Sequence, residues 1–143
     1  MEQTERVVVG VDGSPVSIEA LGWALRYAEK TGAAVAAVYG WQPPVVYGTA
    51  VEAVPGESFT ETAERALNES VDAAVQGRED LVVERTAALG HPAKVLIEQS
   101  KTADLLVVGS RGQGGIKGTL LGSVSLHCVT NADCPVVVIR AAE

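Results

Sequence analysis

The architecture of this chain follows from residues 6–15, which read Arg6-Val7-Val8-Val9-Gly10-Val11-Asp12-Gly13-Ser14-Pro15. The run of valines is short, apolar and β-branched, which is typical of a strand buried on both faces, as in a parallel sheet. Ser14 is a suitable helix N-cap, and Pro15 suits the first helical position. A buried strand that turns directly into a helix is the opening unit of an α/β fold.

The same alternation continues to the end of the chain. Further apolar strands are predicted at residues 34–39, 81–87, 105–108 and 135–139. Helices are predicted from Ser14 to Gly32, from Ser58 to Gly77, after His91, and from about Ser123 to Asn131. Strands that alternate with helices predict an α/β fold with a mostly parallel sheet, in one of a few doubly wound topologies. We expect a single domain over residues 1–143.

The connection from Trp41 to Glu57 breaks this alternation. It holds three prolines and two glycines, and we expect it to be irregular. Loops of this length are usually functional lids or disordered segments. Trp41 and Tyr47 are candidates for a lid over a ligand, and the equal alternative is that they pack the loop onto the domain.

Composition excludes several classes of function. The chain carries 18 acidic and 11 basic residues, a net charge of −7, and 4% aromatic residues. An acidic chain with few aromatic residues is a poor binder of DNA, RNA or anionic membranes. No apolar run is long enough to cross a bilayer, and the amino terminus has no secretory pattern. We therefore expect a cytoplasmic protein that binds neither nucleic acid nor membrane.

A glycine-rich stretch follows the strand at 105–108. Between Gly109 and Ser123, six of fifteen residues are glycine, and a helix is predicted to begin at the end of the stretch. Glycines let a ligand approach the main chain, and consecutive N–H groups together with a helix N-terminus bind anions. A strand, a glycine loop and a helix start form the architecture of a phosphate site.

The local charge favours the same interpretation. No Asp or Glu occurs from Leu105 to Ala132, whereas 18/143 × 28 gives about 3.5 expected in a window of that length. Arg111 and Lys117 are basic residues within it. Neither the Walker A spacing nor the dinucleotide pattern Gly-x-Gly-x-x-Gly is present, which excludes a P-loop NTPase and an ordinary NAD domain.

Asp12 is the candidate partner of this loop across the sheet. Ligands of open α/β sheets bind at the carboxyl ends of strands where the winding reverses. If the first and fourth strands are neighbours there, Asp12 and Gly109 flank one crevice. Asp12 would then bind a ribose hydroxyl or a metal carried by phosphates. The alternative is a turn residue, because Asp-Gly is common turn chemistry.

The spacing Gly109-x2-Gly112-x9-Gly122-Ser123 resembles the ATP-binding branch of the universal stress protein family. The first strand and turn, and the ending Asp133-Cys134-Pro135-Val136-Val137-Val138-Ile139, are also similar to that family. The resemblance covers essentially the whole chain. It implies an open five-stranded parallel sheet of order 3-2-1-4-5 with helices on both faces, a Rossmann-like fold close to adenine nucleotide alpha hydrolases.

The resemblance also implies roles for single residues. Asp12 would contact the ribose or a Mg2+ ion bound with ATP, Val38 would hydrogen-bond adenine through its backbone, and Gly109 would lie against the ribose. Gly112, Gly122, Ser123 and Val124 would hold phosphates through their backbone N–H groups, with the Ser123 hydroxyl assisting. Arg111 and Ser125 complete the expected nucleotide-binding set. The family commonly dimerises through the last strand, which predicts a homodimer with Val136, Val137, Val138 and Ile139 at its interface.

No catalytic constellation is evident in the sequence. We therefore expect a nucleotide-binding regulatory module of the stress response rather than a dedicated enzyme, with slow ATP hydrolysis at most. The alternatives are an ATPase or autophosphorylating protein that uses Ser110, Thr119, Ser123 or Ser125, and a preference for cAMP or AMP. Cys128 and Cys134 are expected to be structural thiols, with oxidant sensing as the alternative.

Overall fold

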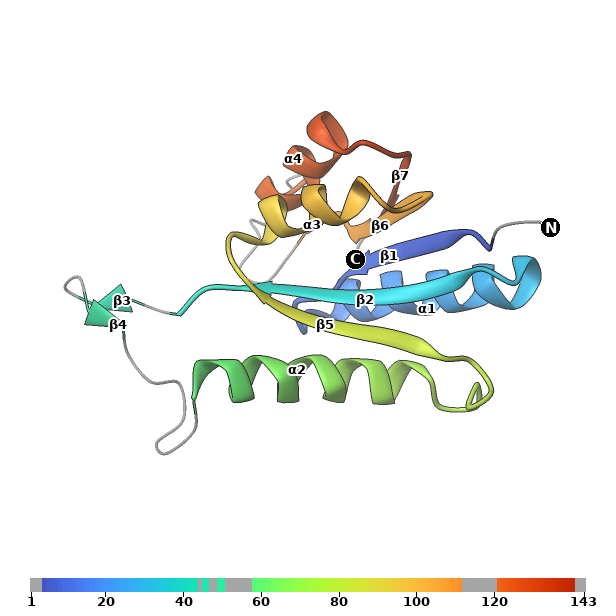
Figure 1. The fold of residues 1–143 in the computed structure, drawn as a ribbon, viewed down its shortest axis with the longest axis horizontal. Helices are drawn as coiled ribbons and strands as arrows, with labels where there is room; N and C mark the ends of the chain where they lie inside the picture. The colour runs from blue at the N-terminus through green and yellow to red at the C-terminus, as the bar shows by residue number, and fades with distance from the viewer. Residues whose placement is uncertain (1–3, 44, 47–48, 51–57, 112–120, 141–143) are drawn as a thin grey trace.

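The computed structural model describes residues 4–43, 45–46, 49–50, 58–111 and 121–140. Figure 1 shows a single main sheet with helices on both sides. In chain order the elements are β1 (Arg6–Gly10), α1 (Pro15–Thr31), β2 (Ala34–Trp41), β3 (Val45–Val46), β4 (Thr49–Ala50), α2 (Phe59–Ala74), β5 (Val83–Leu89), α3 (Pro92–Ser100), β6 (Leu105–Gly109), α4 (Ser123–Asn131) and β7 (Val136–Ile139).

The main sheet has the order β5-β2-β1-β6-β7, and all of its pairings are parallel. These strands are the third, second, first, fourth and fifth of the predicted set, so the predicted order 3-2-1-4-5 is confirmed. Val8 lies opposite Ala36 on one side and Leu106 on the other. The chain therefore winds outward from β1 in one direction, returns to β1, and winds outward in the other.

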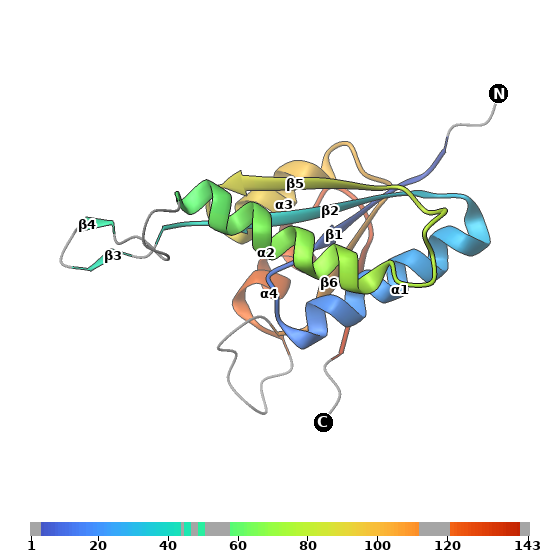
Figure 2. The same cartoon turned by 90° about the horizontal axis from the view of Figure 1, so that it is seen from below.

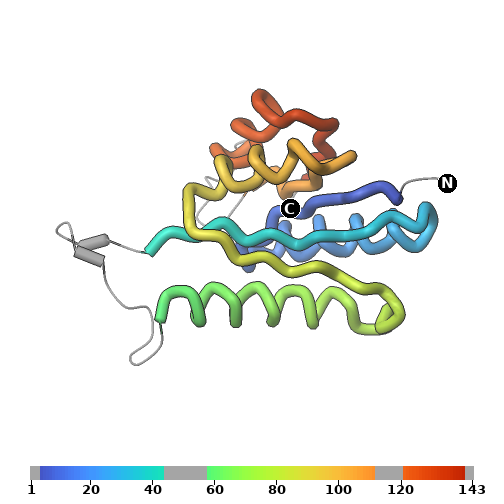
Figure 3. Tube along the Cα trace, in the orientation of Figure 1, coloured from blue at the N-terminus to red at the C-terminus, as the bar shows by residue number. Residues whose placement is uncertain are grey.

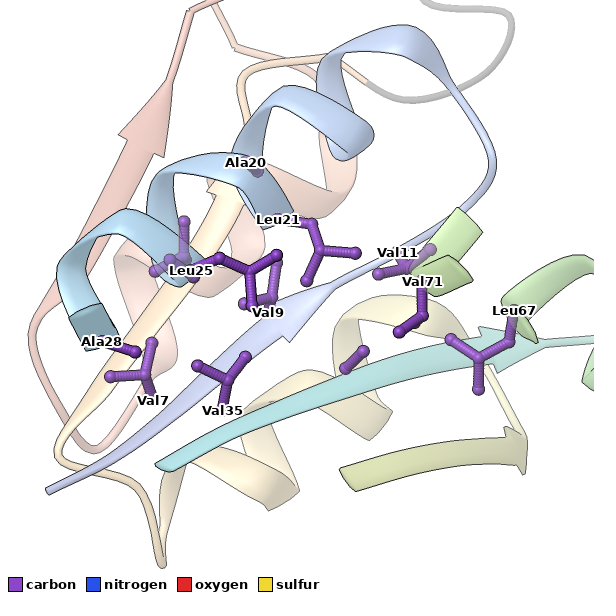
Figure 4. Close-up of a cluster of buried hydrophobic side chains, with 13 residues drawn as sticks. Val7, Val9, Val11, Ala20, Leu21, Leu25, Ala28, Val35, Leu67 and Val71 are labelled. Carbon is purple, nitrogen blue, oxygen red and sulfur yellow. The ribbon is translucent and has the colours of Figure 1, made fainter. Parts of the chain in front are cut away.

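Helices cover both faces of this sheet. Figure 2 shows α1 and α2 side by side across one face, and the tube in Figure 3 shows α3 and α4 together on the other. Successive valines of β1 point to opposite faces of the sheet and pack against the two helix layers. Val7 and Val9 pack under α1, as Figure 4 shows, and Val8 packs with Leu96 of α3 and Cys128 of α4. All three valines are fully buried, and each contributes about 1.5–3 kcal/mol by leaving water.

Local signals set the helix ends. The Ser14 hydroxyl accepts a hydrogen bond from the Ser17 N–H at the start of α1, and Gly32 ends this helix at a φ of 77°. The Ser58 hydroxyl accepts from the Glu61 N–H at the start of α2. These caps confirm the predicted starts of α1 and α2 and the predicted end of α1, because each satisfies a backbone group that the helix itself leaves without a partner. The second helix was predicted to end at Gly77, but it ends at Ala74 with Val75 as its C-cap.

Some of the predicted strands and connections differ from the structure. The strand predicted to begin at Leu81 begins at Val83 and runs to Leu89, because the Leu81 N–H bonds the Arg78 carbonyl in a turn. The connection after β2 was predicted to be irregular, but it contains the short antiparallel pair β3–β4. The second strand was predicted to end at Tyr39, but β2 runs to Trp41, the first residue of that connection.

The glycine at the end of β6 allows α1 to lie close to the sheet. A Cβ atom placed on Gly109 would lie 2.8 Å from Cγ1 of Val16 and 3.3 Å from the Val16 carbonyl carbon. The first contact is shorter than real Cβ atoms tolerate, and the second involves backbone that cannot rotate away. Gly109 is thus required by packing, whatever its contact with a ligand.

We predict that Gly109→Ala lowers the free energy of unfolding by about 1–3 kcal/mol, because the added methyl overpacks the contact with Val16. Gly22→Ala is the matched control. A Cβ at Gly22 meets the flexible end of Arg26 at 3.4 Å within α1, so this change should stabilise by about 0.5–1 kcal/mol. Urea denaturation measures both, and equal midpoints for Gly109→Ala and the wild type would contradict the packing argument.

Candidate functional site

A pocket of about 650 Å³ lies at the carboxyl ends of β1, β2 and β6. Its walls come from the turn after β1, the end of β2, the start of α3, the end of β6 and the start of α4. The predicted neighbourhood of Asp12 and Gly109 is confirmed, because β1 and β6 pair directly and both residues line this pocket. The pocket thus occupies the point where the winding of the sheet reverses.

Almost all the predicted ligand-binding residues meet in this pocket. It is lined by Asp12, Val38, Gly109, Arg111, Gly122, Ser123, Val124 and Ser125. Gly112, Lys117 and Thr119 lie outside the described residues. The described members lie up to 113 positions apart in the sequence (125 − 12 = 113). The fold brings these distant residues together in one pocket.

Asp12 is held by the first turn of α1. One carboxylate oxygen, Oδ1, accepts hydrogen bonds from both the N–H and the hydroxyl of Ser14. The Asp12 N–H donates in turn to the Ser17 hydroxyl at 3.3 Å. Asp12 is therefore a turn residue and a pocket residue at once, so the two interpretations of the sequence are compatible. Its position in the wall is set by the helix cap itself.

The start of α4 forms the opposite wall. Gly122 is its N-cap and has no side chain to bond the helix N–H groups, and the Leu126 N–H makes the first bond back to the Gly122 carbonyl. Helix geometry leaves the N–H groups of Ser123, Val124 and Ser125 without intrahelical acceptors. These donors and the positive end of the helix dipole border the pocket, an arrangement that can bind an anion.

The two hydroxyls on this wall differ in access. Ser123 is exposed, whereas Ser125 is 2% exposed and its hydroxyl bonds protein carbonyls. Ser110, another candidate for phosphorylation, is 3% exposed. Of the serines considered for autophosphorylation, Ser123 is thus the accessible one within the described part of the chain.

The backbone of Val38 is already used within the fold. Its carbonyl accepts the Val11 N–H at 2.9 Å, and its side chain is fully buried. A carbonyl oxygen has two lone pairs, so this bond leaves acceptor capacity toward the pocket. Val38 lines the pocket together with the apolar side chains of Leu96 and Val108.

The pocket also contains residues that the sequence did not single out as ligand-binding. These are Gly10, Val11, Ser17, Tyr39, Gly40, Gln42, Pro92, Leu96, Val108 and Leu121. In the sequence, nothing distinguishes Ser17 from the other polar residues of the predicted amphipathic helix. Burial and the nearby Asp12 carboxylate raise the pKa of the Tyr39 phenol, which stays protonated at neutral pH. Trp41 lines the pocket, as a lid residue would, whereas Tyr47 lies outside the described residues.

The histidines have structural contacts. Nδ1 of His91 accepts the Ala93 N–H at 3.2 Å as the N-cap of α3, the helix predicted to follow His91. The His127 ring bonds the Ser123 carbonyl, and the two rings lie edge to face with centroids 6.4 Å apart. Within the described ranges, no three His, Cys, Asp or Glu side chains are grouped so that they could hold a metal.

None of the helices in the described part of the chain has the length and apolar character needed to cross a membrane.

Fold and pocket together define a doubly wound α/β protein with its pocket at the topological switch point. A family model described as the universal stress protein family matches residues 3–140. This chain belongs to that family.

The relatives differ in length. A universal stress protein of Mycobacterium tuberculosis is 39% identical over 137 residues, which are 94% of this chain and 45% of the relative. The chain thus spans about half the length of that relative. A universal stress protein of Methanocaldococcus jannaschii is 33% identical over 144 residues, which cover 95% of this chain and 82% of the relative.

The fold is shared with solved structures. A crystal structure of a universal stress protein in complex with cAMP is 26% identical to this chain, with a TM-score of 0.73. The match covers 99% of this chain and 100% of the other. The family resemblance inferred from the glycine spacing is therefore confirmed.

The two cysteines lie on the α3/α4 side of the sheet. Cys128 is fully buried in the core cluster, and burial raises the pKa of its thiol to about 11. Cys134 is partly buried, and burial together with the carboxylates of Asp104 and Asp133 raises the pKa of its thiol. Thiolates are the reactive form, so both environments disfavour oxidation and support the structural interpretation.

We predict that iodoacetamide at pH 8 leaves Cys128 unmodified in the folded protein and labels it rapidly in urea. Cys134 should react slowly, and first of the two. Because folding raises the pKa of the Cys128 thiol, its contribution to stability is complete below the unfolded value near 9 and is lost as the pH rises toward 11. Mass spectrometry measures the labelling, and fast reaction of Cys128 in the native state would contradict this assignment.

Proposed function

We propose that this chain binds an adenine nucleotide in the pocket between β1 and β6, with ATP preferred and carried as its Mg2+ complex. The observation that carries the proposal is the start of α4, where no side chain bonds the first N–H groups and which borders a pocket at the switch point of the sheet. Membership of the universal stress protein family supports it, as does the related structure solved with cAMP.

The phosphates would lie on the α4 wall. The N–H groups of Ser123 and Val124, with those of Gly112 and Gly122 in the same glycine loop, are the proposed donors. The exposed Ser123 hydroxyl and the Arg111 guanidinium add a donor and a positive charge. The absence of Asp and Glu from 105 to 132 removes the repulsion that a polyphosphate would otherwise meet.

The nucleoside would occupy the β1–β2 side of the pocket. We propose that the backbone of Val38 bonds adenine, that Gly109 lies against the ribose, and that Leu96 and Val108 supply apolar wall. Asp12 then faces either a ribose hydroxyl or the Mg2+ ion. When Mg2+ is bound it supplies charge that offsets the phosphates, and Asp12 is the residue that would hold it on this side.

The role that fits these features is regulatory binding in the cytoplasm rather than dedicated catalysis. Phosphoryl transfer needs a positioned base or water in addition to charge stabilisation. Asp12 supplies the carboxylate of the described lining, and this group already accepts two hydrogen bonds from Ser14, the N-cap of α1. Any hydrolysis should therefore be slow, and a nucleotide-dependent signal to a partner is the proposed output.

Isothermal titration should detect Mg2+-ATP binding with a Kd below about 1 mM, and Asp12→Asn should weaken it about tenfold. Asn keeps an oxygen that can accept the two bonds from Ser14, so the variant removes charge and keeps the cap. Titration of cAMP and AMP beside ATP measures how many phosphates the pocket prefers.

Removal of Mg2+ separates the two roles of Asp12. If the carboxylate holds the metal, the difference between Asp12→Asn and the wild type disappears in EDTA. If it holds the ribose, the difference persists in EDTA and appears for AMP as well. An absence of heat with every adenine nucleotide at millimolar concentration would defeat the proposed function.

We also propose that two copies associate through β7. This strand is at one edge of the sheet, and Val136, Val137, Val138 and Ile139 are each half-buried in the single chain. An edge strand presents backbone groups that a second strand can bond. The remaining apolar surface of these four residues would be covered by the second copy.

Sedimentation equilibrium should therefore give twice the 14.8 kDa mass of the chain at micromolar concentration. Val138→Lys on β7 should shift the mass toward that of one chain. Leu89→Lys is the control, because Leu89 is 68% exposed at the end of β5, on the opposite edge of the sheet. A monomeric wild type, or dissociation by Leu89→Lys alone, would exclude β7 as the interface.

A further inference from the structure

The end of β6 and the start of α4 meet at one backbone group, the carbonyl of Ser110. The Gly122 N–H donates to this oxygen at 2.6 Å, and the Ser125 hydroxyl donates to it at 2.9 Å. The Ser110 N–H donates in turn to the Ile139 carbonyl of β7 at 2.7 Å. The start of α4 is thus bonded to the end of β6, and the end of β6 is bonded to the edge strand.

The hydroxyl of Ser125 has no proton left for a ligand. It carries one hydrogen, which lies within reach of the Ser110 carbonyl at 2.9 Å and the Gly122 carbonyl at 3.0 Å. Phosphate oxygens are acceptors at neutral pH, so a phosphate could be bonded by this side chain only if both carbonyls gave up the donor. Burial of Ser125 to 2% exposure makes that exchange unfavourable, because the carbonyls would stay without water.

We propose that Ser125 is a positioning residue of the nucleotide site and that its hydroxyl is not a phosphate ligand. It fixes Gly122 against Ser110, and so holds the first N–H groups of α4 in the wall of the pocket before a ligand arrives. This inference rests on the proposed nucleotide binding and gives a specific role to the side chain of Ser125, which the sequence analysis counted among the nucleotide-binding residues. Preorganised donors bind an anion without the cost of ordering the loop.

Loss of the Ser125 hydroxyl should affect ligands with phosphates more than ligands without them. The two bonds that Gly122 and Ser125 donate to the Ser110 carbonyl, called the clasp below, hold the start of α4 where the phosphates would bind. Loss of the clasp should therefore weaken the binding of each ligand in proportion to the number of phosphates it carries. We expect Ser125→Ala to weaken Mg2+-ATP about tenfold and to leave adenosine within about twofold of the wild type, which corresponds to the loss of one well-made hydrogen bond at the phosphate end.

A matched control is available in the same layer of the protein. Ser100 is 1% exposed, donates to the Ile97 carbonyl at 2.6 Å and accepts the Asp133 N–H at 2.9 Å. Ser100→Ala therefore removes an equally buried, doubly bonded hydroxyl that does not line the pocket. It should lower stability as Ser125→Ala does, while the ratio of ATP affinity to adenosine affinity stays at the wild-type value.

The experiment compares four proteins: the wild type, Ser125→Ala, Ser125→Thr and Ser100→Ala. Titration calorimetry gives the affinities for Mg2+-ATP and adenosine, and amide hydrogen exchange without nucleotide gives the protection of the Gly122 N–H. Ser125→Ala should lower both the affinity ratio and the Gly122 protection, and Ser100→Ala should change neither. Ser125→Thr, which keeps the hydroxyl, should restore the two together.

Two results would overturn the positioning role. One is an unchanged ratio in Ser125→Ala. The other is a lowered ratio with Gly122 protection intact, which would mean that the hydroxyl contacts phosphate directly. A wild type that binds no adenine nucleotide would instead defeat the proposed function. In that case the exchange of Gly122 still decides whether Ser125 holds the clasp, so the two failures are distinguishable.

Discussion

The parallel pairing of β1 with β6 is the constraint on which the pocket depends. The chain adds β2 and β5 on one side of β1 and then returns to place β6 on the other. The helix α1 packs with Val7 and Val9, and α4 packs with Val8 on the opposite face of the sheet. The turn after β1 and the start of α4 both line the pocket at the paired ends of β1 and β6. A pocket at the carboxyl ends is therefore a consequence of strand order.

Each wall of that pocket is fixed by polar contacts of a different range. The Asp12 wall is local: Asp12, Ser14 and Ser17 bond one another within a single turn of chain. The α4 wall is fixed over a distance, because Gly122 and Ser125 both donate to Ser110, which lies twelve and fifteen positions earlier. The local wall forms whenever α1 forms. The α4 wall forms only after α4 has packed next to β6, so it requires the completed fold.

This difference in range explains what the sequence could predict. The strands follow from β-branched runs, the caps from Ser14, Gly32 and Ser58, and the place of the pocket from a glycine loop that joins a strand to a helix start. All of these signals lie within a few residues of the feature they predict. Gly109 shows where such reasoning stops, because its contact with Val16 depends on the approach of a helix that begins 94 positions earlier (109 − 15 = 94). The bonds of Ser125 were not predictable for the same reason, since hydroxyl-to-carbonyl pairing leaves no pattern in sequence.

The two helix starts that border the pocket differ in charge, and this difference would set the orientation of a bound nucleotide. At α1 the Ser14 hydroxyl accepts the Ser17 N–H, and the Asp12 carboxylate places negative charge against the positive end of the helix. At α4 the cap is a glycine, and within the described residues no carboxylate lies in the surrounding sequence. A polyanion is repelled at the first start and attracted at the second. A nucleotide entering this pocket would therefore place its phosphates on α4, and the face it turns toward Asp12 must carry hydroxyl donors or a cation.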